Sequence, residues 1–315
     1  MVVFWAVDPT DQDLEIAQRV GKVASLWSSA LETQATPVSV ISHRNLTWLS
    51  GKVPVPLKEV LSDVAIRNIR SLVAKVNVKN IAEPRLIFRE DVTRSRRSEA
   101  RALVEEANRQ KASAIVVAAH GPDRLKQIRL GSFTEYLIAT STVPIVVVNP
   151  KTEPPEKIER ILFPTDFSED SEIVFRHLLD IAKKVGAAVV VFHVNDLAFR
   201  SLTLAGDWGV SLDPLLVSEA WNEEQQRKNK KMAAWEKLAE DQGVRCKIVS
   251  ISSGDGLSQT IIDVERNENA DLVAMTTYAG PVEQAFLGSV ARDVIYGAAR
   301  PVLIVPVPRD RKLSA

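Results

Sequence analysis

The stretch GSFTEYLIATSTVPIVVVNP, from Gly131 to Pro150, returns 157 residues later as GSVARDVIYGAARPVLIVPV, from Gly288 to Val307. Each copy begins with a Gly-Ser pair, continues through a short helical segment and reaches a proline that opens a run of branched apolar residues. The spacing from the Gly-Ser pair to this proline is the same in both copies. Self-similarity of this kind is the signature of a repeated structural unit.

A second match lies at the start of each copy. The segment VVFWAVDPTDQDLE, from Val2 to Glu15, corresponds to RILFPTDFSEDSE, from Arg160 to Glu172. Both run from an apolar strand into an aspartate, Asp8 or Asp166, and then into an acid-rich helix start; the two aspartates are 158 positions apart. Because 315 residues are also about twice the length of a typical domain, the sequence predicts two tandem copies of one domain.

The segment NPKTEPPEKIER, residues 149–160, separates the two copies. It is rich in proline and charge, which is typical of an exposed linker rather than of a core element. We expect a first domain over residues 1–150, a linker over 151–158 and a second domain over 159–315.

Short apolar runs alternate with helical segments inside each copy. In the second copy the runs RILFPT, AVVVFHV, CKIVSI, DLVAMTT and PVLIVPV have the composition of strands. Near-continuous Val, Ile and Leu strands separated by helices indicate a parallel sheet covered on both faces. The predicted fold class is therefore α/β, with two doubly wound, parallel, five-stranded sheets of strand order 3-2-1-4-5.

Each copy carries an insertion after its second strand, around residues 44–60 and 196–240. Packing of the inserted loop and helix onto their own domain is the favoured interpretation, and a lid or a subunit contact is the alternative. The apolar strands that end the copies, PIVVVN and PVLIVPV, are predicted to be edges that pair with each other or with a second subunit. An intramolecular pseudo-dimer is therefore expected, and a homodimer is left open.

Composition argues against several classes of protein. The chain has 40 basic and 40 acidic residues, so no net charge attracts it to nucleic acid or to an anionic membrane. Its one cysteine, Cys246, excludes an internal disulfide and favours a cytoplasmic location. Its four histidines show no metal-ligand spacing with cysteine or carboxylates, so no metal site is predicted.

Two glycines enclose a basic loop after the predicted fourth strand of the first copy, in the stretch HGPDRLKQIRLGS. Ligands of open α/β sheets bind beyond the carboxyl ends of the strands, where Asp8 and Gly121 would flank one crevice. The Gly131-Ser132 pair opens a helix whose unpaired N–H groups attract phosphate. Arg124, Lys126 and Arg129 would neutralise its charge. The plainer interpretation is a strand end, a helix start and a solvated basic face.

These residues resemble a motif of the universal stress protein family, whose domains are small α/β units, some of which bind ATP. Its nucleotide-binding members carry Gly-x-x-Gly, nine residues and Gly-Ser or Gly-Thr, with an aspartate after the first strand; here Ala118 replaces the leading glycine and the rest is kept. The resemblance implies an adenine nucleotide, ATP or a relative, in the first domain, with Mg²⁺ left open. The implied binding residues are Asp8, Pro9, Val117, Ala118, His120, Gly121, Arg129, Gly131, Ser132 and Phe133.

The second copy departs further from this motif. Thr276 and Ala279 occupy the two loop glycine positions, and the loop is one residue shorter before Gly288-Ser289. A side chain with a Cβ resists positive φ by about 1 to 2 kcal/mol and blocks close approach of a ligand. We expect a degenerate pocket formed by Asp166, Thr276, Gly280, Gly288 and Ser289.

No pair of nucleophile and base stands out, so no catalytic residue is predicted. The expected function is that of a stress-response protein that senses or sequesters ATP without strong catalysis. One alternative is a nucleotide-free scaffold that binds a protein partner through its insertions. Another is a weak ATPase.

Overall fold

We analysed a computed structural model of the chain. It describes residues 2–10, 13–42, 55–89, 95–120, 130–194, 214–251, 256–277 and 287–307. No helix among these residues is both long enough and apolar enough to cross a membrane.

The amino-terminal half alternates strands and helices. Its elements are β1 (Val2–Ala6), α1 (Leu14–Ala30), β2 (Ala35–Ser42), α2 (Val55–Val76), β3 (Arg85–Arg89), α3 (Arg96–Arg109), β4 (Ala112–Ala118), α4 (Ser132–Thr140) and β5 (Ile145–Val148). The strands are parallel and lie in the order β3-β2-β1-β4-β5. This is the predicted order 3-2-1-4-5.

The carboxyl-terminal half repeats the arrangement. Its elements are β6 (Arg160–Pro164), α5 (Glu169–Val185), β7 (Ala188–Val194), α7 (Pro214–Asp241), β8 (Cys246–Ile251), α8 (Leu257–Asn267), β9 (Leu272–Thr277), α9 (Ser289–Gly297) and β10 (Val302–Pro306). The order β8-β7-β6-β9-β10 is again 3-2-1-4-5. The predicted fold class is therefore confirmed for both halves.

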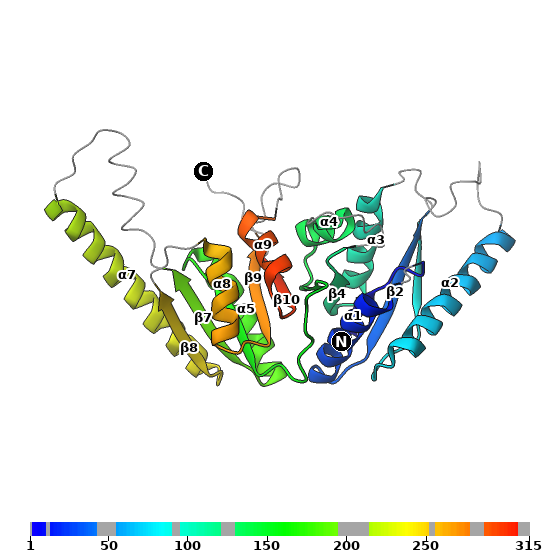
Figure 1. Cartoon of the computed structure of the whole chain (residues 1–315), viewed down its shortest axis with the longest axis horizontal. Coiled ribbons are helices and arrows are strands. Elements are labelled where there is room, and N and C mark those ends of the chain that lie inside the picture. Colours follow the sequence, from blue (N-terminus) through cyan, green and yellow to red (C-terminus); the bar gives the residue numbers. More distant parts are fainter. Residues whose placement is uncertain are drawn as a thin grey trace.

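The two five-stranded sheets join along their last strands into one ten-stranded sheet. β5 pairs with β10 in antiparallel fashion, and the central pair of this register is Val146 with Leu303. These two residues are 157 positions apart, the offset between the repeats in this region, so they are equivalent. A pseudo-twofold axis therefore passes between them, and the halves spread from it in the V of Figure 1.

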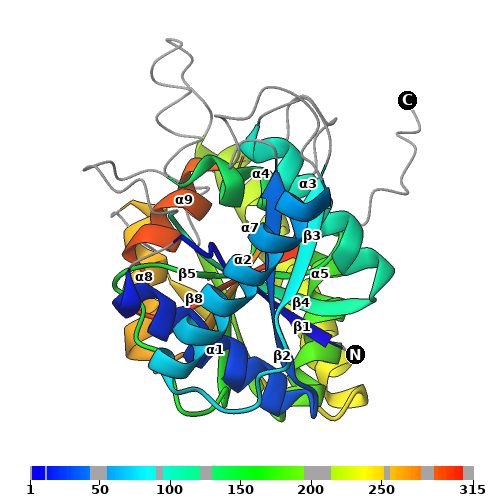
Figure 2. The same ribbon diagram turned by 90° about the vertical axis from the view of Figure 1, so that its right-hand side faces the viewer.

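Helices cover both faces of the sheet, as buried Val, Ile and Leu strands require. One continuous core contains residues of α1, α2, α5 and α7, and the other contains residues of α3, α4, α8 and α9. Alternation along β1 sends Val3 and Trp5 into the first core and Phe4 into the second. Figure 2 shows α1 and α2 on one side of the strands and α3 on the other.

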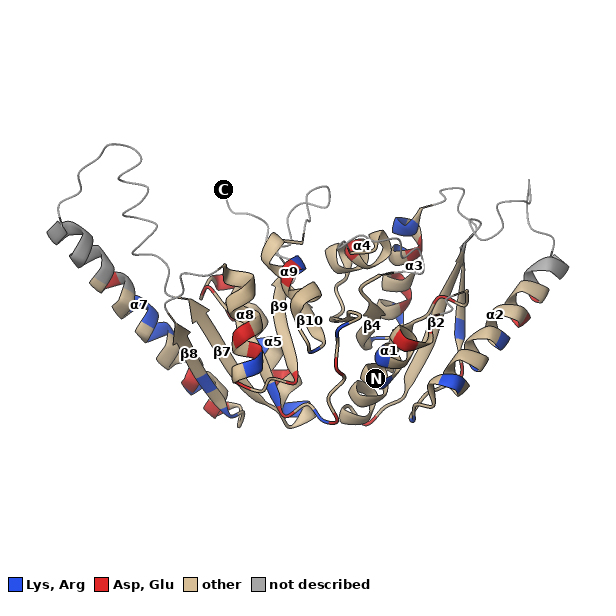
Figure 3. Ribbon diagram, viewed as in Figure 1, with Lys and Arg blue, Asp and Glu red and all other residues tan. Residues whose placement is uncertain are grey.

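Charged side chains of both signs are mixed along the helices. Figure 3 shows acidic and basic residues side by side on α1, α5 and α7. Several pairs are exposed neighbours one helical turn apart, such as Arg176 with Glu172 at 2.8 Å. Exposed pairs of this type contribute little stability, so the cores dominate the fold.

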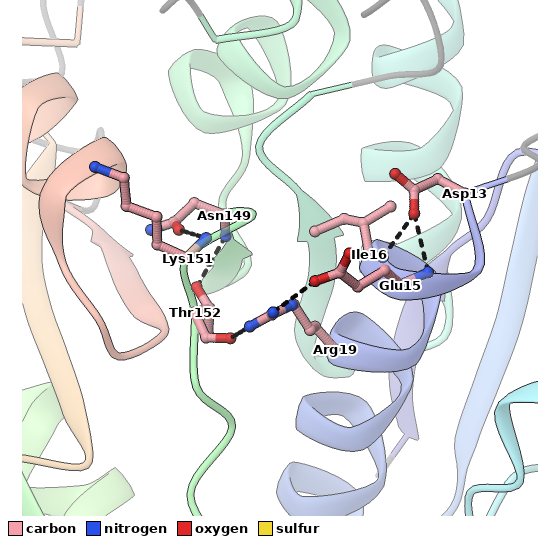
Figure 4. A network of polar contacts seen from close by, with 7 residues as sticks. All are labelled: Asp13, Glu15, Ile16, Arg19, Asn149, Lys151 and Thr152. Atoms are coloured by element: carbon pink, nitrogen blue, oxygen red, sulfur yellow. Dashed lines mark hydrogen bonds and ion pairs between the residues drawn. The ribbon is translucent and has the colours of Figure 1, made fainter.

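The linker is more deeply anchored than the sequence predicts. Glu153, Glu156 and Lys157 are exposed, as expected, but Thr152 is completely buried and Ile158 is 6% exposed. The reason lies in contacts distant in sequence. Arg19 of α1 donates a hydrogen bond to the Thr152 carbonyl oxygen, and Figure 4 shows this contact bridging α1 and the linker.

Asn149, the residue after β5, fastens the start of this linker. Its buried side-chain amide donates to the carbonyl oxygens of Ile295 (2.6 Å) and Ala298 (3.0 Å), at the carboxyl end of α9. Its Oδ1 accepts from the backbone N–H of Lys151 at 2.6 Å, and the backbone N–H of Asn149 donates to Thr152 Oγ1. One amide side chain thereby satisfies polar groups from both halves of the molecule.

Candidate nucleotide site

The predicted site residues of the amino-terminal half follow β1 and β4. These strands are direct parallel neighbours, with Trp5 opposite Val116. Parallel strands end at the same edge of a sheet, so Asp8 and the segment Ala118–His120 lie on that edge. The structure therefore brings together two sequence segments that are about 110 residues apart.

Helix α4 begins directly over the end of β4. The Gly131 amide donates to the Ala119 carbonyl oxygen at 2.9 Å, and Thr134 Oγ1 donates to the Ala118 carbonyl oxygen at 2.8 Å. Leu130, just before the helix, is 8% exposed and packs into the core. These contacts hold the amino terminus of α4, with Ser132 at its first position, at the same sheet edge as Asp8.

The start of α4 has no side chain that caps it. Helices α1, α3 and α5 are capped by Asp13, Ser95 and Ser168, whose oxygens accept first-turn amides. The cap position of α4 is Gly131, which has no side-chain oxygen to offer. Gly131 adopts φ −61°, so it does not need the left-handed conformation; its lack of a side chain leaves the helix mouth open to an anion.

Asp8 is held at the mouth of this site by local and distant partners. Its Oδ1 accepts from the Thr10 amide at 2.9 Å and from Thr10 Oγ1 at 2.6 Å. Its Oδ2 lies 3.9 Å from Nη1 of Arg96, the first residue of α3. Asp8 is 27% exposed, so the carboxylate stays accessible from solvent.

Arg96 is a site residue that the sequence analysis missed. Besides Asp8, its Nη1 lies 3.5 Å from Glu99 Oε2, and Glu99 is almost fully buried. The guanidinium group thus stands between two carboxylates at the sheet edge where phosphate is expected. The basic pair Arg96-Arg97 at a helix start is visible in the sequence, but Asp8, the partner of Arg96, is 88 residues away.

The other predicted residues of this pocket have different surroundings. Val117 is buried in the core, and Phe133 packs against that core from α4. The Pro9 carbonyl oxygen accepts from Asn68 of α2 at 3.4 Å. The His120 ring lies 5.3 Å from the Tyr296 ring of α9 in the other half. Gly121, Arg129 and the loop cations Arg124 and Lys126 lie outside the described residues.

Tyr296 connects this edge to the junction of the two halves. Burial and, to a lesser degree, the nearby Glu135 raise the pKa of its hydroxyl to about 12. The phenol is therefore neutral at physiological pH. His120 thus belongs to the interface between the halves as well as to the strand end that it follows.

The equivalent aspartate in the carboxyl-terminal half makes the same local turn. Asp166 Oδ1 accepts from the Ser168 amide at 2.9 Å and from Ser171 Oγ at 2.7 Å. Burial alone would raise the pKa of Asp166, but the hydrogen bonds from Ser171 and Ser168 outweigh it and lower the pKa below its ordinary value. Its carboxylate is therefore committed to the start of α5.

An aromatic side chain packs next to Asp166, after the end of β6. Phe167 adopts φ +57° and is 3% exposed. Its ring lies 4.9 Å from Trp235 and 5.1 Å from His193, and Lys231 Nζ donates to its carbonyl oxygen. Positive φ in a bulky residue is unfavourable, so this packing must hold it there. Phe167 therefore belongs to the core that α5 and α7 cover, on the opposite face of the sheet from α9.

The remaining residues of the second pocket keep part of the first pocket's pattern. Gly288 and Ser289 start α9 as Gly131 and Ser132 start α4, again without a side-chain cap. A Cβ placed on Gly288 would meet no atom within 4 Å. Thr276, in β9, pairs with Val305, and Gly280 lies outside the described residues.

Other chemistry finds little support at these edges. In the described ranges, no group of three or more His, Cys, Asp or Glu side chains could hold a metal ion. His193 Nδ1 lies 2.8 Å from the Thr165 carbonyl oxygen, which is the backbone contact expected of a histidine at a strand end. The site offers helix amides, a carboxylate and a guanidinium group, which suit binding of a phosphorylated ligand.

Comparison with known proteins agrees with this architecture. A universal stress protein of Methanocaldococcus jannaschii is 34% identical over 154 residues, covering 48% of this chain and 84% of that protein. A second one from the same organism is 28% identical over 157 residues, covering 47% of this chain and 94% of its own length. The crystal structure of a universal stress protein from Archaeoglobus fulgidus covers 98% of this chain and 97% of its own, with a TM-score of 0.61 and 16% identity, and so shares its fold.

The model of the universal stress protein family matches the chain twice, over residues 3–149 and 157–306. Each match covers one complete set of five strands. The chain therefore belongs to the universal stress protein family and carries its domain in tandem.

Proposed function

We propose that the amino-terminal half binds an adenine nucleotide such as ATP, and that the protein senses or sequesters this nucleotide in a stress response. The observation that carries the proposal is the uncapped start of α4, fixed to the end of β4 and beside the end of β1. Helix amides there suit phosphate, and Asp8 suits hydroxyl or amine donors of a ribose or base.

Arg96 extends this proposal to the charge of the ligand. Its guanidinium group is shared between Asp8 and Glu99, at 3.9 and 3.5 Å. Neither distance is that of a tight bidentate pair. A phosphate at the mouth of α4 would offer Arg96 a stronger partner and would free the Asp8 carboxylate for the ribose or base.

The carboxyl-terminal half is proposed to be a degenerate partner that does not bind nucleotide. Asp166 is engaged by Ser168 and Ser171, and Thr276 and Ala279 stand at the two loop glycine positions of the motif. The uncapped start of α9 remains, so the proposal rests on these differences around it.

We propose no enzymatic activity, since the described site holds no nucleophile with an adjacent base. Mg²⁺ would accompany the nucleotide through its phosphates, and the carboxylates at this edge are Asp8 and Glu135, which lies in the first turn of α4. The single cysteine is in keeping with a cytoplasmic location. Its thiol lies in β8 of the carboxyl-terminal half.

A matched pair of variants tests the proposal by titration calorimetry with ATP. Ser132→Asp places a carboxylate at the first position of α4, where it stabilises the helix but repels phosphate. Ser289→Asp makes the same change at the equivalent position of α9. We expect one ATP per chain for the wild type, an affinity at least about tenfold lower for Ser132→Asp, which is about 1.4 kcal/mol, and no change for Ser289→Asp.

Two results would reject the proposal. One is the absence of saturable binding by the wild-type protein. The other is an equal loss of affinity in the two variants, because it would show that the halves do not differ. Circular dichroism of both variants provides the control that they remain folded.

A further inference from the structure

A cavity lies at the junction of the two halves, away from the candidate nucleotide site. Its volume is about 590 Å³, and its walls come from α1, α5, the start of β4, the segment before β5 and the end of β10. It reaches Ser113 at the start of β4, whereas the nucleotide residues follow Ala118 at the other end. At about 3.3 Å per residue these ends are roughly 17 Å apart, so the cavity is a separate site.

The pseudo-twofold axis relates this cavity to the path of the linker. His177 in the cavity wall is equivalent to Arg19, which donates to the Thr152 carbonyl oxygen. Thr142 in the wall is equivalent to Ala299, whose carbonyl oxygen accepts from the Glu153 amide at 2.7 Å. The counterpart of the cavity is therefore filled by residues 151–158 of the chain itself.

The filled counterpart shows what kind of ligand this geometry accepts. Its occupant is an extended segment in which Thr152 is completely buried and Pro154-Pro155 favour an extended backbone. The neighbouring residues bind its main-chain carbonyl and amide groups, and such contacts do not depend on the sequence of the bound segment. His177 and Thr142 line the open cavity at the corresponding positions.

The charges around the cavity favour an acidic occupant. Lys111, Lys184 and His177 line it with one acid, Asp180. Within the described residues, no carboxylate lies within 4 Å of the amino group of either lysine. The linker that fills the counterpart carries two acids, Glu153 and Glu156, and two bases, Lys151 and Lys157, so the preference for an acidic occupant rests on the lysines of the open cavity. Apolar walls such as Trp27 and Val307 complete a surface for the body of a peptide.

We infer that this cavity is a docking groove for an extended, acidic segment of a partner protein. The partner chain would lie between α1 and α5 as the linker does on the other side of the axis. Its carbonyl groups would accept from His177, and its carboxylates would pair with Lys111 and Lys184. The groove thus gives the tandem chain a binding surface that does not depend on nucleotide.

Fluorescence anisotropy with a labelled peptide TEPPE, the sequence of Thr152 to Glu156, tests the inference on the full-length protein. We expect saturable binding, and an affinity about tenfold lower for Lys184→Glu because the substitution replaces an attraction by a repulsion. Lys183→Glu is the matched control, since Lys183 is exposed on the same helix but does not line the groove. A peptide TKPPK with reversed charge should bind at least about tenfold more weakly to the wild type.

Three results would overturn the inference: no saturable binding of TEPPE, equal affinity for the two peptides, or equal losses in Lys184→Glu and Lys183→Glu. A variant that lacks residues 308–315 provides a further measurement of TEPPE binding. If TEPPE binds only to this shortened chain, the occupant of the groove is the carboxyl-terminal segment of the protein itself, and the partner proposal is wrong.

Discussion

The two halves of the molecule share every strand and their order, but they differ at the end of the first strand. In the amino-terminal half Pro9 follows Asp8, and in the carboxyl-terminal half Phe167 follows Asp166. Phe167 turns inward at φ +57°, a conformation that the ring of proline forbids at Pro9. This difference sends a side chain into the core under α5 and α7 in the carboxyl-terminal half.

The halves also distribute their core volume differently. In the amino-terminal half Trp5 packs over Gly21, where an added Cβ would lie 3.0 Å from the indole ring. The equivalent residues in the other half are Phe163 and Leu179, both fully buried. Tryptophan and glycine in one half thus correspond to two residues of intermediate size, phenylalanine and leucine, in the other. The fold therefore tolerates repacking when total volume is kept.

The largest effect on stability is expected from Trp235→Ala, which removes an aromatic side chain from the core of the carboxyl-terminal half. The Trp235 ring stacks on Phe175 at 4.3 Å and contacts Phe163 and Phe167. Its removal leaves a cavity under Phe167 and should lower the free energy of unfolding by about 3 to 5 kcal/mol. Urea denaturation measures this loss. Leu257→Ala is the control, since Leu257 is 45% exposed and should change stability by less than about 0.5 kcal/mol; an equal loss in both would contradict the role of the aromatic cluster.

A second difference is a buried acid at a position where the other half has an alanine. Glu265 of α8 is equivalent to Ala107 of α3 and is 2% exposed. Burial raises its pKa to about 7, and the donated amides and the nearby Arg266 and Arg300 reduce that rise. Its Oε1 accepts from the Ala299 amide at 3.1 Å, so it supports the turn before β10.

Because the pKa of Glu265 is raised in the folded state, the folded protein holds this proton more tightly than the unfolded chain. Stability should fall as the pH rises from 4.5 through about 7, by on the order of 3 kcal/mol. Glu265→Gln removes the ionisation and should be more stable than wild type at pH 8 but similar at pH 4. Thermal unfolding of both proteins across this pH range measures the difference. If the melting temperatures of the two proteins change with pH in parallel, Glu265 does not have the raised pKa.

The smallest expected effect concerns two equivalent residues of opposite charge. Glu135 of α4 and Arg292 of α9 correspond across the pseudo-twofold axis and form an ion pair at 2.6 Å. Pairing of two amino-terminal halves would bring Glu135 against its own copy, so the unlike charges favour pairing within one chain. Both side chains are more than one third exposed, so solvent weakens the pair.

Arg292→Glu should therefore cost only about 0.5 to 1 kcal/mol, and adding Glu135→Arg should restore the loss. Chemical denaturation of the single and double variants measures the coupling. If the double variant is no more stable than the single one, the pair has no role in matching the halves. Sedimentation of the same variants would show whether loss of the pair favours association between chains.

The repeats, the strand order and the strand-end location of the site could be read from sequence because they depend on local patterns. The Val, Ile and Leu runs mark buried parallel strands, and the constant spacing from Gly131 to Pro144 and from Gly288 to Pro301 marks the duplication. The Gly-Ser pair at a helix start likewise follows from short-range chemistry. Such features need no knowledge of which elements meet in space.

Contacts between distant segments could not be predicted. Arg96 reaches Asp8 only because α3 starts beside the end of β1. Thr152 is polar and lies in a proline-rich segment, yet Arg19 and Asn149 bury it. Phe167 would be expected at the surface of a helix start, and only the position of Trp235 in α7 explains its inward turn. In each case the partner is more than 60 residues away or the conformation is unusual for the residue type.

The most direct test of the difference between the halves is hydrogen–deuterium exchange with and without ATP. The account predicts slower exchange in the presence of ATP at the amides of Ser132 to Thr134, at the mouth of α4. It predicts unchanged exchange at the equivalent amides of Ser289 to Ala291, at the start of α9. Equal slowing at both helices, or no slowing at α4, would contradict the claim that only the amino-terminal half holds a nucleotide.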